Sequence, residues 1–181
     1  IAWNSGVHYV AWEEGAFNAA NIRGPRVTPD GAVLEAGGSN LCTAARRQAL
    51  PSVAPLGTGF LVVWDDERNT IPDIYGTRVS GAGEVLDPSG IAMSQADDAQ
   101  QNPALAWNGT NCVVVWGDAR AGVSFNIHGA RIAPAGSVLD ATGFPICTQS
   151  GDQDEASITW TGSRFLVAGA DWPNGTHTDC A

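Results

Sequence analysis

The chain repeats itself about every 52 residues, and this repetition limits its fold more than any other feature. A tryptophan recurs at equal intervals as Trp12, Trp64 and Trp116. The arginine of an Ile-x-Gly-x-Arg motif recurs as Arg26, Arg78 and Arg131. Such self-similarity is typical of architectures in which one structural unit is stacked several times. We expect one unit over 1–181, with repeats of approximately 1–50, 51–102, 103–155 and a partial 156–181.

Each repeat contains four short segments that are rich in β-branched and aromatic residues and are separated by Gly, Pro, Asp and Asn. In the third repeat they are the segment ending at Trp107 and residues 112–116, 127–132 and 144–148. This pattern predicts strands joined by tight turns. Four antiparallel strands per repeat predict an all-β fold of β-propeller blades, either a propeller or a propeller fragment, with three full repeats and half of a fourth.

Composition excludes several classes of partner. The formal net charge is −10, and the nine cationic residues, all arginine, face nineteen acidic ones. A basic surface for nucleic acid is therefore not expected. The longest apolar runs, such as residues 60–64, are much shorter than a membrane span. The 44% of hydrophobic residues is enough for a packed core.

The order Trp-x-Asp-x-Arg, followed by Ile-x-Gly-x-Arg-Val-x-x-x-Gly-x-Val-Leu-Asp, resembles the repeats of bacterial secreted and cell-surface β-propeller proteins. Most of those proteins are uncharacterised. The resemblance covers nearly the whole chain and implies a propeller fold and an extracellular, cell-surface or periplasmic location. It does not imply one function, because propellers include lectins, hydrolases and scaffolds.

Residues that recur at the same repeat position are predicted to be structural. We expect Trp12, Trp64 and Trp116 to fill the space between blades instead of stacking on sugars. Acidic and arginine residues that recur together predict charge-assisted hydrogen bonds between loops and strands or between blades. These charged residues are Asp66, Asp118, Arg68, Arg120, Arg26, Arg78 and Arg131.

One tryptophan lies outside the repeated positions. Trp172 stands in the segment Asp-Trp-Pro-Asn-Gly near the end of the chain. Tryptophan is enriched at binding surfaces. Trp172, Asp171, Asn174 and His177 are therefore the candidate ligand-binding residues.

Carboxylate-rich stretches suggest calcium as a possible cofactor. The best candidate metal ligands are Asp65, Asp66 and Asp73; residues 97–98 and 152–155 are further acidic stretches. None of them matches the calcium loop D-x-[DN]-x-[DN]-G. Solvated acidic loops are the favoured interpretation of these stretches, and a calcium site is the alternative.

The four cysteines match no zinc or redox motif. Cys42 and Cys147 occupy one repeat position, where the second repeat has Met93, and a small buried apolar role suits both. Cys180 could instead bond to Cys42 if the fourth repeat closes against the first.

Three and a half repeats leave a blade face and strand edges uncovered. Three solutions are open: a longer polypeptide continues the ring, two copies complete it together, or the last residues close a small four-bladed ring. Self-association or the remainder of a longer chain is therefore an expected partner.

No nucleophile elbow is present, and the three histidines fall at different repeat positions. No catalytic residue is assigned, and an enzyme is not the favoured interpretation. The favoured function is non-catalytic binding or scaffolding, with a glycan or protein ligand at the loop tips or channel mouth. The alternatives are a structural subunit that docks through its open blade face, and a carbohydrate-active enzyme with channel carboxylates.

Overall fold

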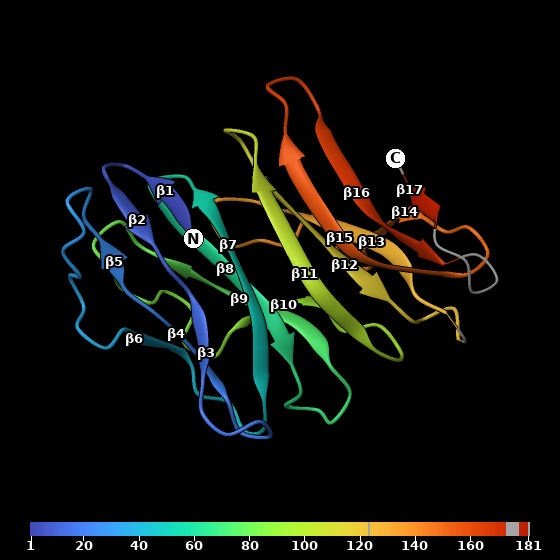
Figure 1. Cartoon of the computed structure of the whole chain (residues 1–181), viewed down its shortest axis with the longest axis horizontal. Coiled ribbons are helices and arrows are strands. Elements are labelled where there is room, and N and C mark those ends of the chain that lie inside the picture. The colour runs from blue at the N-terminus through green and yellow to red at the C-terminus, as the bar shows by residue number, and fades with distance from the viewer. Residues whose placement is uncertain (123, 173–177, 181) are drawn as a thin grey trace.

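The structure is a computed structural model and describes residues 1–122, 124–172 and 178–180. Over these residues the chain forms strands and no helix. The strands make five antiparallel sheets. The sheets follow one another across the molecule in sequence order, from the blue N-terminal side to the red C-terminal side (Figure 1).

The second and third repeats each form a complete four-stranded blade, as predicted. The second blade consists of β7 (Gln48–Leu56), β8 (Gly59–Asp66), β9 (Asp73–Val79) and β10 (Ile91–Ser94), paired in that order. The third consists of β11 (Gln100–Trp107), β12 (Cys112–Asp118), β13 (Asn126–Ile132) and β14 (Phe144–Cys147). The prediction of short antiparallel strands in blades of about 52 residues is confirmed.

The first repeat has the same strand order but is divided into two smaller sheets. One contains β1 (Ala2–Asn4), β2 (Val7–Tyr9) and β5 (Arg26–Val27). The other contains β3 (Trp12–Glu14), β4 (Asn21–Gly24) and β6 (Ser39–Cys42). Pro25 lies at the division, where the later repeats have Thr77 and Ala130. Proline has no N–H to donate, so the ladder is interrupted there.

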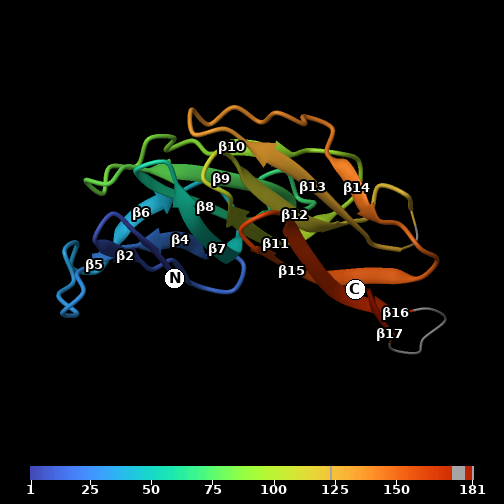
Figure 2. The ribbon, with the colours of Figure 1, turned by 90° about the horizontal axis from the view of Figure 1, so that it is seen from above.

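The fourth repeat supplies β15 (Asp152–Trp160), β16 (Phe165–Trp172) and β17 (Thr178–Cys180), which form a three-stranded sheet. The first strands β7, β11 and β15 contact one another from sheet to sheet. They therefore form the inner edge of the blades. Figure 2 shows β10 and β14, the fourth strands, on the opposite side of the molecule from β7 and β15.

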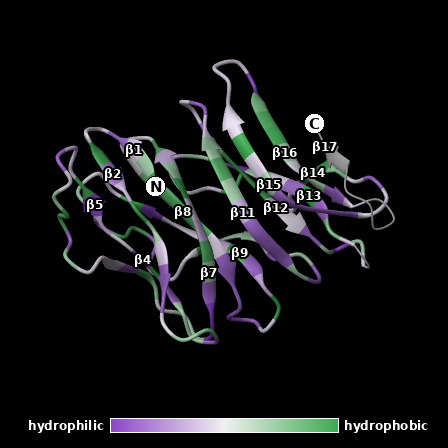
Figure 3. Ribbon diagram, viewed as in Figure 1, coloured by the Kyte–Doolittle hydropathy of each residue, from purple (hydrophilic) through white to green (hydrophobic). Residues whose placement is uncertain are grey.

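The hydrophobic core lies between the blades. One cluster joins the first and second blades, another the second and third, and another the third and fourth. β8 and β12 are buried along their whole length because both faces are covered. Polar residues gather where the inner strands begin, and Figure 3 shows this early part of β11 in purple.

A hydrogen-bonded group closes the second strand of each complete blade. Trp64 is fully buried, and its indole N–H donates to Asp66 Oδ2 at 2.8 Å. Arg68 donates to the same carboxylate from its backbone N and its Nε, and its Nη1 donates to Ser89 O. The third blade repeats this arrangement with Trp116, Asp118, Arg120 and Thr142. The recurring Trp, Asp and Arg therefore act on one another within the blade.

The cysteine predictions need two corrections. In the structural register Cys42, Ser94 and Cys147 are equivalent, because they pair with Ile22, Ile74 and Ile127. Met93 is one residue away and is equivalent to Leu41 and Ile146, because each of the three fourth strands has a bulge at this point. Cys42 and Cys112 are free thiols, so the bond considered between Cys42 and Cys180 is not formed.

Candidate functional site

The inner strands share a backbone irregularity close to their first residues. Leu50, Asn102 and Glu155 have left-handed φ angles of 51°, 57° and 53°. The strand register shifts across each of them, which identifies a β-bulge. A left-handed conformation is costly for a residue with a side chain, so surrounding contacts must maintain it. The predicted repeat boundaries after residues 50, 102 and 155 fall at these bulges, inside the inner strands.

A buried glutamine anchors each bulge. Gln48, Gln100 and Gln153 stand two residues before the left-handed position and are fully buried. The backbone N–H of Gln100 donates to Pro72 O at 2.8 Å. Its side-chain amide donates to the carbonyls of Ala96, Asp97 and Asp98. The glutamine therefore ties the preceding loop and the neighbouring turn to the start of the inner strand.

Carboxylates from the preceding blade accept the bulge N–H groups. Asp65 Oδ1 accepts from Asn102 N at 2.9 Å, and Glu13 Oε2 accepts from Leu50 N at 3.3 Å. The third repeat has Gly117 at this position. A Cβ on Gly117 would lie 2.7 Å from Asp154 Oδ1, so the missing side chain leaves room for Asp154. The repeat symmetry is broken between the third and fourth blades.

Asp154 is the centre of the polar group that results. It accepts hydrogen bonds from Gln101 Nε2 at 3.0 Å and from Asn102 Nδ2 at 3.1 Å. Asn102 thus contacts Asp154 through its side chain and Asp65 through its backbone. Burial raises the pKa of Asp65 to about 8; the nearby carboxylates of Asp154 and Glu67 add to this, while the Asn102 N–H and Arg47 oppose it. Asp65 therefore carries its proton at neutral pH.

A cavity of about 450 Å³ lies beside this group. It is lined by Phe125, Asp152, Asp154, Glu155 and Trp172. β15 begins here and antiparallel β16 ends here, so Asp152 and Trp172 are register partners. The Phe125 N–H donates to Asp152 Oδ1 at 2.9 Å and fixes the aromatic residue beside the carboxylates. We call these five residues the acidic–aromatic pocket.

This pocket combines two aromatic side chains with three carboxylates. Aromatic rings offer flat apolar surface, and carboxylate oxygens accept hydrogen bonds from ligand hydroxyl groups. Ligand sites typically combine apolar walls with a few directed polar groups. The arrangement is suited to a ligand that has an apolar face and several donors.

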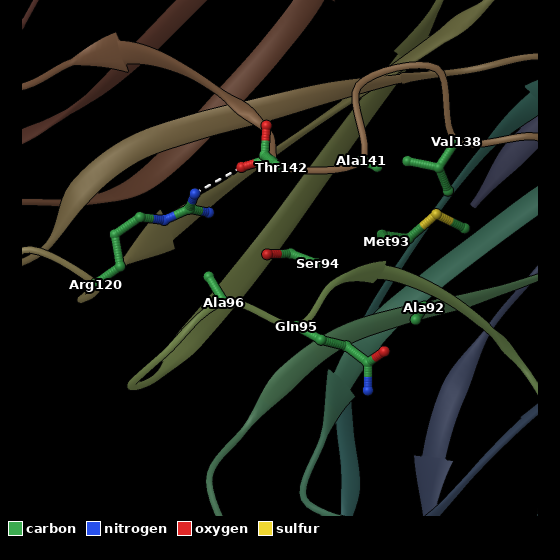
Figure 4. A pocket seen from close by; sticks show the side chains of 9 residues that line it. All are labelled: Ala92, Met93, Ser94, Gln95, Ala96, Arg120, Val138, Ala141 and Thr142. Carbon is green, nitrogen blue, oxygen red and sulfur yellow. Dashed lines mark hydrogen bonds between the residues drawn. The ribbon is translucent and has the colours of Figure 1, made fainter.

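A second cavity, of about 360 Å³, lies between the second and third blades (Figure 4). Met93, Ser94 and Arg120 are among its lining residues. The Arg120 guanidinium binds Asp118 and donates to Thr142 O, as Figure 4 shows for the Thr142 bond. The same bonds occur around Arg68 in the second blade. The charge that Arg120 brings to this cavity wall is therefore part of the repeated structure.

The candidate ligand-binding residues lie in different environments in the structure. Trp172 is 37% exposed and lines the acidic–aromatic pocket. Asp171 is buried, with its Oδ1 3.4 Å from Gln153 Nε2. Asn174 and His177 lie outside the described residues.

The three carboxylates of the predicted calcium site are not brought together. Asp65 and Asp66 are consecutive in β8 and face opposite sides of the sheet: Asp65 bonds to Asn102 and Asp66 to Trp64 and Arg68. Asp73 is bonded to Asn69. Among residues 1–122, 124–172 and 178–180, no group of three His, Cys, Asp or Glu is arranged to hold a metal ion.

Sequence reasoning missed Phe125 and Asn102 and read residues 152–155 only as an acidic stretch. The sequence does contain a feature that could have indicated the site. Glu13, Asp65 and Gly117 are equivalent, and the glycine marks the blade at which the carboxylate must come from elsewhere. A break in the repeat pattern was the indicator of the site.

Comparison with known proteins gives structural likeness without sequence likeness. No family model matches the chain, and no curated protein matches it. Within the described part of the chain, no helix is long and apolar enough to span a membrane.

Solved structures do resemble it. An exo-1,5-α-L-arabinanase from a bovine ruminal metagenomic library aligns with a TM-score of 0.59 at 12% identity, over 98% of this chain and 70% of that one. A thermostable family-43 glycoside hydrolase gives a TM-score of 0.60 at 16% identity, over 97% and 67%. A Cellvibrio cellulosa α-L-arabinanase in complex with arabinohexaose gives 0.51 at 12%, over 98% and 70%. At these identities the likeness establishes the fold alone, and the fold of the chain is that of a β-propeller.

Proposed function

We propose that this protein binds carbohydrate, without altering it, at the acidic–aromatic pocket. The observation that carries the proposal is the position of Trp172 and Phe125 beside Asp152, Asp154 and Glu155 in one cavity. The pocket would act in an extracellular, cell-surface or periplasmic protein.

The chemistry of the pocket supports this proposal. A pyranose or furanose ring has an apolar face that packs on an aromatic side chain and hydroxyl groups that donate to carboxylates. Asp154 is held by amide groups of Gln101 and Asn102, so its position is fixed before a ligand arrives. A fixed acceptor needs little reorganisation on binding. The fold is shared with structures named as arabinanases, one of them with arabinohexaose bound.

The test is binding of the whole chain to a glycan array, followed by calorimetry with arabino- and xylo-oligosaccharides. Trp172→Ala and Asp154→Asn should each weaken binding at least about tenfold, which corresponds to about 1.4 kcal/mol. Trp3→Ala is the matched control, since Trp3 is also exposed but lies away from the pocket. Equal affinity in the wild type and in Trp172→Ala would contradict the proposal.

A specific observation favours hydrolysis as the second candidate function. Asp65 and Asp154 lie on either side of Asn102, and Asp65 has a pKa of about 8. A carboxyl group that keeps its proton at neutral pH can serve as a general acid beside a second carboxyl group. Release of reducing sugar that disappears in Asp65→Asn would establish this function, whereas binding without product over a day would exclude it.

A further inference from the structure

Successive blades pack by one repeated rule. Along β8, the side chains of Phe60, Val62 and Trp64 pack against the first blade, while Leu61 and Val63 pack against the third. β12 alternates in the same way between the second and fourth blades. Each blade therefore has a face that receives the preceding blade and a face that packs on the following one.

A charged contact joins the outer parts of neighbouring blades. The guanidinium of Arg26 binds Glu35 of its own blade and donates from Nη1 to Gly81 O of the next blade at 2.9 Å. Arg78 does the same with Asp87 of its own blade and Pro134 O of the third, at 3.5 Å. The arginine is always on the earlier blade and the carbonyl on the later one.

The receiving blade has a glycine beneath the arginine. A Cβ on Gly83 would lie 2.7 Å from Arg26 Nε, and a Cβ on Gly136 would lie 2.8 Å from Arg78 Nε. Both glycines have φ near +89°, which other residues rarely adopt. The receiving half of the contact is thus defined by a glycine and by a carbonyl two residues before it.

The first blade has this receiving half, but no arginine of the described residues lies on it. Gly31 has the same φ of +89°, Pro29 is equivalent to Gly81 and Pro134, and a Cβ on Gly31 would have nothing within 4 Å. Val33 is 53% exposed, whereas its equivalents Val85 and Val138 pack against the core clusters.

Two tryptophans on the same face show the same difference. Trp12 is partly exposed, while its equivalents Trp64 and Trp116 are fully buried. Trp3 is 48% exposed, while its equivalent Trp107 packs against the core. We call this surface the receiving face of the first blade; it comprises Trp3, Trp12, Pro29, Gly31 and Val33.

We propose that the receiving face is one half of a blade–blade interface, occupied in the working protein by a further blade of the same repeat class. That blade carries an arginine in its third strand and an acidic residue nine positions later, as Arg26 and Glu35 do. The two internal interfaces show both halves of this contact, whereas the receiving face shows one half, so a further blade would continue the same series.

A second copy of this chain does not supply the required blade. Its Arg26 and Arg78 already bind the blades that follow them. Its Arg131 binds Asp140 and is 52% exposed, but the face of the blade that carries it is already covered by β15 and β16 of the fourth blade. Each copy also has a formal net charge of −10, which opposes self-association.

The test adds such a blade in front of the whole chain. A duplicate of residues 48–104 is fused directly before Ile1. The junction keeps the register, because Ala106 pairs with Val113 as Ala2 pairs with Tyr9, so Leu105 is equivalent to Ile1. The added blade places a copy of Arg78 over Pro29 and Gly31.

The fused protein should unfold in one transition with a melting temperature at least about 5 °C higher. Amide hydrogen exchange should slow in residues 28–34. Arg78→Ala in the added copy alone should remove much of both gains, and Gly31→Ala should cost more stability in the fusion than in the parent chain.

Separate melting of the added blade with unchanged exchange at residues 28–34 would overturn the proposal. So would a fused protein that is insensitive to Arg78→Ala in the added copy. A duplicate of residues 100–157, which carries Arg131 and Asp140, repeats the test with an independent sequence. Finally, a parent chain that is dimeric by native mass spectrometry and protected at residues 28–34 would show that a second copy covers the face, contrary to the proposal.

Discussion

The first and third blades share a sequence pattern but differ in how their equivalent tryptophans are buried. Trp116 is fully buried against the second blade, and its indole N–H bonds to Asp118. Trp12 occupies the same position on the receiving face of the first blade, which no other blade covers in the described structure, and it is partly exposed. The difference teaches that burial in a repeat protein is determined by the neighbouring repeat and not by the residue.

The same two blades also differ in which arginine binds the acidic residue near the end of the second strand. The first blade has Ala16 where the third has Arg120. Its guanidinium comes instead from Arg23 on β4, which binds Glu14 and donates to Gly38 O at 3.0 Å. A contact between an acid and an arginine near the end of the second strand is kept although its sequence position changes.

The largest difference in stability between the two blades is expected when their tryptophans are removed. Trp116→Ala leaves a cavity in the core and should lower the free energy of unfolding by about 4 kcal/mol. Trp12→Ala removes a side chain that is already partly hydrated and should cost about half as much. Urea unfolding followed by far-UV circular dichroism measures both. Equal costs would mean that Trp12 is covered in solution.

Removal of the acidic residues should give the next largest difference. Asp118→Ala takes away the acceptor of the Trp116 indole and the Arg120 guanidinium and should cost about 3 kcal/mol, since hydrogen bonds to a buried charged group are involved. Glu14→Ala removes a half-exposed partner of Arg23 and should cost less than about 1 kcal/mol. Asp118→Asn, which keeps the shape of the side chain, should fall between them in thermal unfolding.

Asp65 should make the stability of the protein depend on pH. In the unfolded chain its carboxyl ionises near pH 4, whereas in the folded protein burial holds its pKa at about 8. The folded state therefore binds the extra proton between these values. Stability should fall as the pH rises through this window, by up to about 1.4 kcal/mol per pH unit.

Asp65→Asn should remove this slope, which thermal unfolding of both proteins from pH 5 to 8.5 would show. His128, whose pKa burial lowers, acts in the opposite direction only below about pH 6.5. Comparison of the two proteins cancels its effect. Parallel curves for the wild type and the variant would mean that Asp65 ionises normally in the folded protein.

The smallest effect is expected at the division of the first blade. Pro25→Ala should restore a ladder hydrogen bond worth about 1 kcal/mol, but the unfolded chain gains a similar freedom, so the net change should be within about 0.5 kcal/mol. Amide exchange at Val10 and Ala11 should nevertheless slow as the ladder becomes continuous. Unchanged exchange there would show that proline is not the cause of the division.

Much of the fold could be predicted from the sequence because its determinants are local and repeated. The spacing of Trp12, Trp64 and Trp116 predicted the blade length, and the β-branched segments predicted the strands. The predicted repeat boundaries fall inside the inner strands, because these strands continue through a bulge at Pro51 and Pro103.

The site was less predictable because its residues meet across blades. Trp172 was recognised by its departure from the repeat, but its pocket neighbour Phe125 comes from the third blade, just before β13. Asp152 is its register partner on β15, which only the strand pairing reveals. The metal prediction treated Asp65 and Asp66 as near in space because they are near in sequence. Adjacent residues of a strand point to opposite faces, which is why it failed.

The buried glutamines have a consequence for how this protein can change. Gln48, Gln100 and Gln153 hold the same left-handed turn whatever residue stands two positions later: leucine in the second blade, asparagine in the third, glutamate in the fourth. One side chain, the glutamine, therefore supports the backbone of the turn, and another, the residue in the left-handed position, determines which groups the turn presents. Each of these three blades therefore has a position beside the inner edge at which a single substitution changes the side chain while the backbone keeps its conformation. Binding specificity can thus change in one blade without a change in the others.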